Sequence, residues 1–322
     1  MTKHSTRRIL TGSPGAHIVA ARARRSLGQH FLVDGEVLRR IAASADVGPG
    51  AAVLEVGAGT GQLTEALLAT GATVAAVELD EDLCRALRAR FAGAERARII
   101  CASVLHHAPE ELLAEAGLAP PYAVVANVPY YITAPILRSM LEAHRAPERL
   151  VLTVQHEVAE SIVATPGSMS LLSVSVQFYA VARLLFEIPR SAFRPPPRVD
   201  SAAVRIDVAP KPRIAVEDRR LFFDVVRAGF RSPRKQLHNT LGQGLWMPPG
   251  AASALLSEAG IDRMRRPQSL ALEEWGEVCR VYALHREQWR AEQAESRASL
   301  PPDAVILRPP KDAPGSEPVE YS

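Results

Sequence analysis

A run of closely spaced glycines followed by an acid is the first place where residue types and spacing indicate a binding site. Residues 53–61 read Val-Leu-Glu-Val-Gly-Ala-Gly-Thr-Gly, so an apolar run passes into glycines that let the backbone turn tightly and approach a ligand. Glu78 ends the next apolar run, where a carboxylate can bind the two hydroxyls of a ribose. Gln62 stands where a dinucleotide-binding fingerprint needs Gly or Ala, so the pattern is G-x-G-x-G instead.

A second polar segment, Asn127-Val128-Pro129-Tyr130, follows a later apolar run, at the edge where open α/β sheets place their chemistry. The amino group of a nucleobase is a poor nucleophile because its lone pair is delocalised into the ring. The Asn127 side-chain oxygen and a main-chain carbonyl near Pro129 can hold the N–H groups and aim the lone pair, while Tyr130 can stack on an extruded base. Such catalysis depends on positioning and electrostatics. An ordinary strand-to-helix turn, where Asn and Pro are common, is the alternative interpretation.

Alternating strands and helices are predicted to position these segments. Apolar runs predict strands at Ala52–Val56, Thr73–Val77, Arg98–Cys101, Tyr122–Ala126 and Leu150–Gln155. Helical spacing predicts helices at 37–45, Thr60–Ala69, Glu81–Phe91, Ala134–Glu142 and from about His156. Leu171–Tyr179 and Ala202–Val208 are interpreted as a closing strand pair. Units of this length predict an α/β fold with a mainly parallel sheet covered on both faces.

The pattern changes along the chain, which predicts four regions. Residues 1–24 are predicted to be a flexible basic tail, and residues 25–208 the α/β domain. After Pro212 apolar residues such as Leu221 and Trp275 follow helical spacing, so residues 209–286 are predicted to form a small helical domain. Residues 287–322 are predicted to be a Pro-rich, disordered tail.

Composition excludes several classes of protein. The 322 residues are 47% hydrophobic and 23% charged, which excludes a chain that is fibrous or disordered throughout. No apolar run is long enough for a membrane span, and the basic N-terminus lacks the apolar core of a secretion signal. Cys84, Cys101 and Cys279 are far apart and odd in number, so we expect neither a disulfide framework nor a metal site, and a reducing compartment.

The positive charge is concentrated in two zones, although the net charge is only +3. Residues 1–25 contain six Lys or Arg and no acid, and residues 188–240 contain twelve basic residues against five acidic ones. This distribution predicts that a polyanion docks on one face, with contacts to phosphates because few aromatics lie among the basic residues. A solvated surface with a solubilising tail is the alternative.

The G-x-G-x-G run with its following acid resembles the class I S-adenosylmethionine-dependent methyltransferases. Five segments in order resemble the ribosomal RNA adenine N6-dimethyltransferase family, most closely its small-subunit type, over about residues 24–285. These segments are residues 25–32 (RSLGQHFL), the glycine loop with Glu78, residues 127–135 (NVPYYITAP), residues 193–201 (FRPPPRVDS) and residues 230–241 (FRSPRKQLHNTL). The resemblance implies a class I, Rossmann-like methyltransferase fold with a small C-terminal helical domain, and S-adenosylmethionine as cofactor.

The resemblance also implies roles for individual residues. The residues implied to contact the cofactor are Gln29, His30, Leu32, Gly57, Gly59, Glu78, Ser103 and Asn127. The residues implied to be catalytic are Asn127, Pro129, Tyr130 and Phe193, with Tyr130 and Phe193 on either side of the adenine. The residues implied to bind rRNA are Arg194, Arg198, Arg231, Arg234 and Lys235. For Phe193 a place in the core is the alternative, although the prolines after it favour a rigid exposed loop.

Several positions depart from the family pattern. Ser103 stands where the family usually has an acid that accepts a hydrogen bond from the adenine amino group of the cofactor, and His30 stands where Asn is usual. Because a serine hydroxyl is shorter and uncharged, we expect weaker cofactor binding by roughly 1–2 kcal/mol. Tyr131 also replaces a commoner Asn, at a position we expect to be tolerant.

The sequence therefore predicts an enzyme that dimethylates two adjacent adenines in a 3′-terminal hairpin loop of 16S rRNA during small-subunit biogenesis. We expect it to be monomeric and cytoplasmic, without a membrane or a metal. The first alternative is an Erm-like methyltransferase of 23S rRNA, which would confer macrolide resistance. The second is a ribosome-assembly or RNA-binding factor with little catalysis, which the departures at Ser103 and His30 favour.

Overall fold

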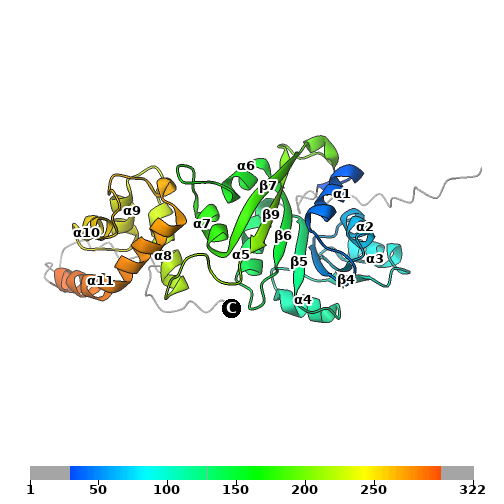
Figure 1. Cartoon of the computed structure of the whole chain (residues 1–322), viewed down its shortest axis with the longest axis horizontal. Helices are drawn as coiled ribbons and strands as arrows, with labels where there is room; N and C mark the ends of the chain where they lie inside the picture. Colours follow the sequence, from blue (N-terminus) through cyan, green and yellow to red (C-terminus); the bar gives the residue numbers. More distant parts are fainter. Residues whose placement is uncertain (1–29, 129, 299–322) are drawn as a thin grey trace, which may run out of the picture.

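The computed structural model describes residues 30–128 and 130–298, and its centre is a seven-stranded sheet of order β4-β3-β2-β5-β6-β9-β7 (Figure 1). The strands of this sheet are β2 (Ala52–Val56), β3 (Thr73–Glu78), β4 (Ala97–Cys101), β5 (Tyr122–Asn127), β6 (Arg149–Gln155), β7 (Ala180–Ile188) and β9 (Ser201–Val208). Strands β2 to β6 are parallel, and β9 is antiparallel to both β6 and β7. Two short strands, β1 (Phe31–Leu32) and β8 (Phe193–Arg194), pair separately. The predicted mainly parallel sheet is confirmed.

Helices cover both faces of the sheet. The helices that precede β7 in the chain are α1 (Gly35–Ser44), α2 (Gln62–Ala69), α3 (Glu81–Arg90), α4 (Pro109–Glu115), α5 (Thr133–Leu141), α6 (His156–Ile162) and α7 (Leu171–Tyr179). Side chains of α1, α2 and α3 join one buried apolar cluster with the sheet, and those of α4 to α7 join another. The order strand, turn, helix therefore brings the carboxyl ends of the parallel strands to one edge, as the sequence predicts.

The predicted strand at Leu171–Tyr179 is wrong, because this segment is helix α7. Ser170 caps the helix by accepting a hydrogen bond from the Ser173 N–H at 3.1 Å. The helix is packed between the sheet and the helix that follows β9, so apolar residues lie on more than one side and the helical period is hidden. Ala202–Val208 is a strand as predicted, but it pairs with β6 and β7.

The chain after β9 is helical, and it lies beyond α7 at one end of an elongated molecule (Figure 1). Its helices are α8 (Arg219–Phe230), α9 (Leu237–Gly244), α10 (Ala251–Glu258) and α11 (Leu272–Ala298). Helices α8 and α11 pack closely at Gly229, where an added Cβ would lie 2.3 Å from the Trp275 ring. The helical region does not end at residue 286 as predicted, because α11 continues to Ala298. The predicted N-terminal tail and the rest of the C-terminal tail lie outside the described residues.

One cysteine pair contradicts the expectation that the cysteines are unpaired. Cys84 and Cys101 form a disulfide, with Cα atoms 5.8 Å apart. Their separation of 17 residues hides this proximity, but β4 pairs with β3 in parallel, and α3 turns back directly after β3. Cys279 is a buried free thiol in α11. In the described part of the chain, no helix combines the length and apolarity needed to cross a membrane.

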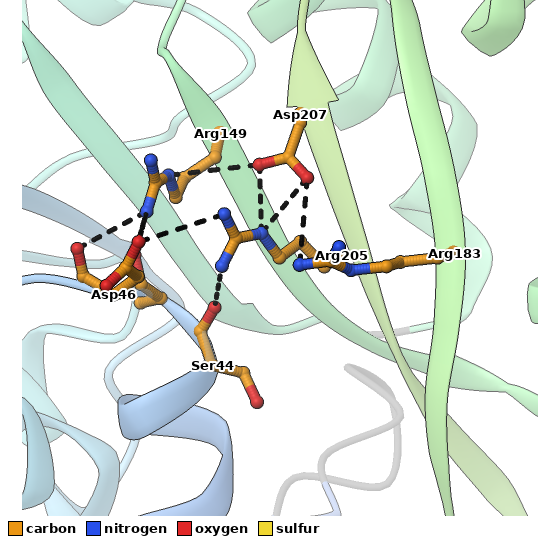
Figure 2. Close-up of polar contacts among 7 residues, drawn as sticks. Ser44, Asp46, Arg149, Arg183, Arg205 and Asp207 are labelled. Carbon is orange, nitrogen blue, oxygen red and sulfur yellow. Dashed lines mark hydrogen bonds and ion pairs between the residues drawn. The ribbon is translucent and has the colours of Figure 1, made fainter.

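An ion-pair cluster holds the carboxyl end of α1 against the sheet (Figure 2). The Arg149 guanidinium donates to Asp46 Oδ2 at 2.8 Å, and this contact holds the pKa of Asp46 below its ordinary value. Arg205 donates to Asp207 Oδ1 at 2.8 Å and to the Ser44 main-chain oxygen at 3.0 Å. Arg149 opens β6, so the cluster lies at the opposite edge of the sheet from Asn127 and fixes one end of α1.

Candidate active site

A cavity of about 220 Å³ lies at the carboxyl ends of β2, β3, β4 and β5. We call it the cofactor pocket, because its lining includes residues that the sequence predicts to contact a cofactor. Its walls come from the residues that end or follow these strands, together with His30, Phe31, Phe193 and the first turn after Asn127. The cavity thus brings together residues from six segments that are separated in the sequence, and it is lined by most of the predicted cofactor-binding and catalytic residues that the structure describes.

The glycine loop forms the floor of the cofactor pocket, as predicted. Gly57 and Gly59 line it, and their φ angles of +74° and +57° lie in the left-handed region that favours glycine. A Cβ on Gly59 would lie 3.1 Å from the Phe31 ring. Glycine is therefore required here both for the turn and for the close approach of the segment that contains Phe31.

Glu78 connects the glycine loop to the end of β3. Its side chain is 6% exposed and lines the cofactor pocket. Oε2 accepts from the Gly59 N–H at 2.8 Å, and Oε1 accepts from the N–H groups of Leu79 and Asp80 at 2.9 and 3.0 Å. Since a carboxylate offers about four acceptor sites, roughly one is left for a ribose hydroxyl. The main chain therefore fixes the carboxylate in place before a ligand binds.

Two exposed apolar side chains at the mouth of the cofactor pocket are site residues that the sequence analysis missed. Leu79 is 58% exposed and Leu105 is 40% exposed, and both line the cavity. Large apolar side chains this exposed beside a hollow favour a planar apolar ligand group such as adenine. Their positions in the sequence could have indicated these two residues: Leu79 directly follows Glu78, and Leu105 lies shortly after β4, the strand that pairs with β3.

The Asn127 amide is oriented by the N-terminal segment. Its Nδ2 donates to the His30 main-chain oxygen at 3.0 Å, which turns Oδ1 the other way. Within the described residues, no protein donor contacts Oδ1, and Asn127 lines the cofactor pocket. The His30 ring Nδ1 is in turn 2.8 Å from the Pro195 main-chain oxygen. His30 therefore links the N-terminal segment to the loop after Phe193, a role that sequence reasoning did not anticipate.

The remaining predicted residues around Asn127 have mixed outcomes. Phe193 lines the cofactor pocket but is 1% exposed, so the expectation that it lies in an exposed loop is wrong: pairing of β8 with β1 buries it. Leu32 is buried in the core, and its neighbour Phe31 lines the cavity instead. Gln29, Pro129 and the side chain of Tyr130 lie outside the described residues.

Comparison with known proteins decides the family. The family described as ribosomal RNA adenine dimethylase matches residues 20–284. The chain belongs to this family. The protein named ribosomal RNA small subunit methyltransferase A from Dehalococcoides mccartyi (strain CBDB1) is 47% identical over 263 residues, which are 81% of this chain and 89% of that protein. The protein of the same name from Moorella thermoacetica is 40% identical over 265 residues, 80% of this chain and 92% of that protein.

Two solved structures agree with this assignment. The 23S rRNA methyltransferase ErmE is 26% identical, with a TM-score of 0.62 over 78% of this chain and 98% of that one. A dimethyladenosine transferase from Plasmodium falciparum is 21% identical, with a TM-score of 0.67 over 79% of this chain and 98% of that one, and supports the fold. This dimethylase is therefore an S-adenosylmethionine-dependent rRNA methyltransferase with a class I methyltransferase fold.

The cofactor pocket of the dimethylase fits this cofactor. Gly57 and Gly59 leave room that a Cβ would fill, Glu78 presents an acceptor, and Leu79 with Leu105 offers an apolar mouth for adenine. Ser103 also lines the cavity and, within the described residues, its hydroxyl has no hydrogen-bond partner. The hydroxyl is thus available to a ligand in this cavity.

A buried acid lies beneath the glycine loop of the dimethylase. Glu55 is 1% exposed, and within the described residues its carboxylate oxygens have no hydrogen-bond partner. Burial is the main cause that raises the pKa of Glu55 to about 8; the nearby Glu78 carboxylate contributes to the rise, and Thr64 opposes it. Glu55 is therefore mostly protonated at neutral pH.

The predicted RNA-binding residues form two separate groups, and neither group lines the cofactor pocket. Arg194 and Arg198 are exposed on the loop beside it. Arg231, Arg234 and Lys235 are exposed in the turn between α8 and α9, which we call the basic turn (residues 231–235). Two further exposed arginines, Arg263 and Arg266, which sequence reasoning did not single out, lie near the basic turn, because main-chain hydrogen bonds join residues 263–265 to the start of α9.

Proposed function

We propose that this dimethylase transfers methyl groups to N6 of two adjacent adenines in a 3′-terminal hairpin loop of 16S rRNA, within the small ribosomal subunit or its precursor. The observation that carries the proposal is the Asn127 amide, held by the His30 carbonyl at the carboxyl end of β5 and beside the cavity that fits the cofactor. Relatives that are 40–47% identical are named for the small subunit, which supports the choice of rRNA.

The residues around Asn127 prepare the adenine amino group for attack. S-adenosylmethionine supplies an electrophilic methyl group. Asn127 Oδ1 and a main-chain oxygen near Pro129 accept the two N6–H groups, which directs the nitrogen lone pair toward the cofactor. The cationic product loses its proton readily, so the step needs no strong general base. After the first transfer the amine rotates about its bond to the ring and presents its second N–H.

Aromatic side chains hold the base out of the RNA stack. Phe193 is the buried wall on which one face of the adenine rests, and Tyr130 stacks on the other face. The β1–β8 pair and the His30–Pro195 contact brace this wall. The site has one set of acceptors for an adenine amino group, so the two adenines enter one after the other.

The basic residues bind the RNA backbone. Arg194 and Arg198 flank the entrance, while the basic turn with Arg263 and Arg266 contacts phosphates farther from the methylated base. RNA affinity then falls as salt increases. We further propose that the enzyme acts as a monomer in the cytoplasm, and that no metal takes part in the transfer.

The deciding experiment measures methyl transfer from labelled cofactor to undermethylated small subunits and to large-subunit rRNA separately, and maps the modified bases. We expect dimethyladenine in small-subunit rRNA alone. Label in large-subunit rRNA would instead support the Erm-like alternative, for which the 26% identity with ErmE is the relevant observation. RNA binding without transfer to either substrate would support the assembly factor.

A further inference from the structure

Two cysteines lie directly behind one side of the cofactor pocket. Cys101 ends β4 and is in register with Glu78 of β3, and Cys84 Sγ lies 3.4 Å from the Glu78 main-chain oxygen. Residues 78–79, before Cys84, and residues 102–105, after Cys101, line the cavity, and we call these two loops the adenosine side. The Cys84–Cys101 disulfide therefore joins α3, which follows the first of these loops, to the end of β4, which precedes the second.

We propose that Cys84 and Cys101 are a reversible oxidation site, and that closing their disulfide tightens cofactor binding by holding the adenosine side together. The inference rests on the assignment of S-adenosylmethionine to this pocket. It goes beyond the methyl transfer itself, because it makes the affinity for the cofactor depend on the redox state of two residues that do not react with substrate.

The accessibility of the two sulfurs fits reversible exchange. Cys101 is exposed, so a dissolved thiol or disulfide can reach it, whereas Cys84 is 1% exposed and reacts only with its partner. Exposed disulfides are the ones that exchange readily. Cys279 does not compete, because burial raises the pKa of its thiol to about 12 and keeps it protonated within α11. Exchange is thus confined to one pair at the pocket.

A low-molecular-weight disulfide such as oxidised glutathione can close the pair in two steps. The Cys101 thiolate attacks one glutathione sulfur, the glutathione S–S bond breaks, and a first glutathione thiolate leaves. The Cys84 thiolate then attacks Cys101 Sγ, and a second glutathione thiolate leaves. Both cysteines are oxidised by two electrons in total, the glutathione disulfide is reduced, and the two cysteine protons end on the two released thiols.

The effect on binding follows from preorganisation. Apart from the disulfide, two contacts hold this loop beside β3: the Ala102 N–H donates to the Glu78 main-chain oxygen at 3.0 Å, and Val104 is buried in the core. Opening the disulfide removes a third tether, so we expect Ser103 and Leu105 to move more in the reduced protein. Ser103 offers this loop a neutral hydroxyl and no carboxylate, so the loop gains little from a hydrogen bond to the adenine amino group of the cofactor. A cross-link two residues before Ser103 lowers the cost of ordering the loop on binding.

The test uses the full-length protein after equilibration with either reduced or oxidised glutathione. Intact mass after alkylation reports the thiol state, and calorimetric titration with S-adenosylhomocysteine reports the dissociation constant. We expect the oxidised protein to bind on the order of three- to tenfold more tightly. Cys101→Ser should bind like the reduced protein under both conditions, and Cys279→Ser should keep the full response.

The outcomes separate this inference from the assignment of the pocket. Equal dissociation constants in the two states, with the disulfide confirmed by mass, would overturn the oxidation site and leave the cofactor assignment intact. Two alkylated thiols at Cys84 and Cys101 after equilibration with the oxidant would overturn it as well. Absence of binding in both states would reject the assignment of the cofactor to this pocket, and the inference with it.

Discussion

The adenosine side of the cofactor pocket and the basic turn are built in opposite ways. On the adenosine side fixed contacts hold the residues in place: three main-chain N–H groups bind the Glu78 carboxylate, and a disulfide joins α3 to the end of β4. In the basic turn Arg231, Arg234 and Lys235 are exposed, and among the described residues their side chains form no ion pair. A small cofactor needs one fixed geometry, whereas a long polyanion can be bound by mobile charges.

This contrast predicts which substitutions damage chemistry, which damage cofactor binding and which damage RNA binding. Changes at Asn127 and on the adenosine side should have large effects confined to a single step. Changes in the basic turn should have small, additive effects that depend on salt.

The largest expected effect is at Asn127. Asn127→Ala removes the acceptor for the adenine amino group, so we expect kcat for small-subunit methylation to fall by about 10²–10³-fold. The dissociation constant for S-adenosylhomocysteine should change much less. Asn127→Asp keeps an oxygen acceptor but loses the donor to the His30 carbonyl, and should be intermediate. If Asn127→Ala kept kcat within tenfold of the parent, the proposed role would be wrong.

The second effect concerns stability and pH at Glu55. The pKa of Glu55 is raised to about 8 in the folded protein from 4.5, so the folded state binds more protons between these values. Stability is therefore greatest at low pH and is lost as pH rises, by about 3 kcal/mol between pH 5 and 8 for this group. Urea unfolding of Glu55→Gln, which mimics the protonated acid, should show a much flatter pH dependence. The exposed Glu95→Gln is the control, and an equally steep dependence in both variants would contradict the prediction.

The third effect tests the main-chain anchoring of Glu78. In Glu78→Gln the charge is lost and one amide N–H faces main-chain donors, so we expect cofactor binding to weaken by about 10- to 100-fold. Calorimetry with S-adenosylhomocysteine measures this directly. Glu81→Gln removes an exposed acid from the same turn and should bind normally. Similar losses in both variants would indicate a general charge effect.

The sequence was sufficient where chemistry requires a particular residue. Gly57, Gly59, Glu78 and Asn127 all line the pocket, and their residue types are restricted by the positive φ angles of the glycines and by the ribose and amine binding that we propose. The sequence was not sufficient to predict features that depend on tertiary packing. Helix α7 is packed on more than one side, so its pattern did not distinguish a helix from a strand.

The remaining errors also have tertiary causes. Phe193 is buried because β8 pairs with β1, across more than 160 residues of sequence, and no local pattern encodes that contact. The Cys84–Cys101 bond depends on the parallel pairing of β3 with β4. The apolar mouth at Leu79 and Leu105 became recognisable only when exposure could be read beside a cavity.

The fourth effect sharpens the description of the adenosine side. Ser103→Asp places a carboxylate at the position where the sequence resemblance implies an acid, and a charge-assisted hydrogen bond to the adenine amino group is worth about 1–2 kcal/mol. We therefore expect the dissociation constant for S-adenosylhomocysteine to fall by roughly tenfold. Ser103→Asn, which is similar in size but uncharged, separates charge from shape. An unchanged dissociation constant in Ser103→Asp would show that this pocket binds adenine without an acid.

The smallest effects per residue are expected in the basic turn. Replacing Arg231, Arg234 and Lys235 by Ala should each lower RNA affinity a few-fold and reduce the slope of log affinity against log salt by about 1. The dissociation constant for S-adenosylhomocysteine should stay unchanged. Arg280→Ala, which removes an arginine paired with Glu277 on α11, is the matched control for net charge. If the triple variant kept the parent's salt slope, RNA would dock elsewhere, and Arg194 and Arg198 beside the pocket would be the next residues to replace.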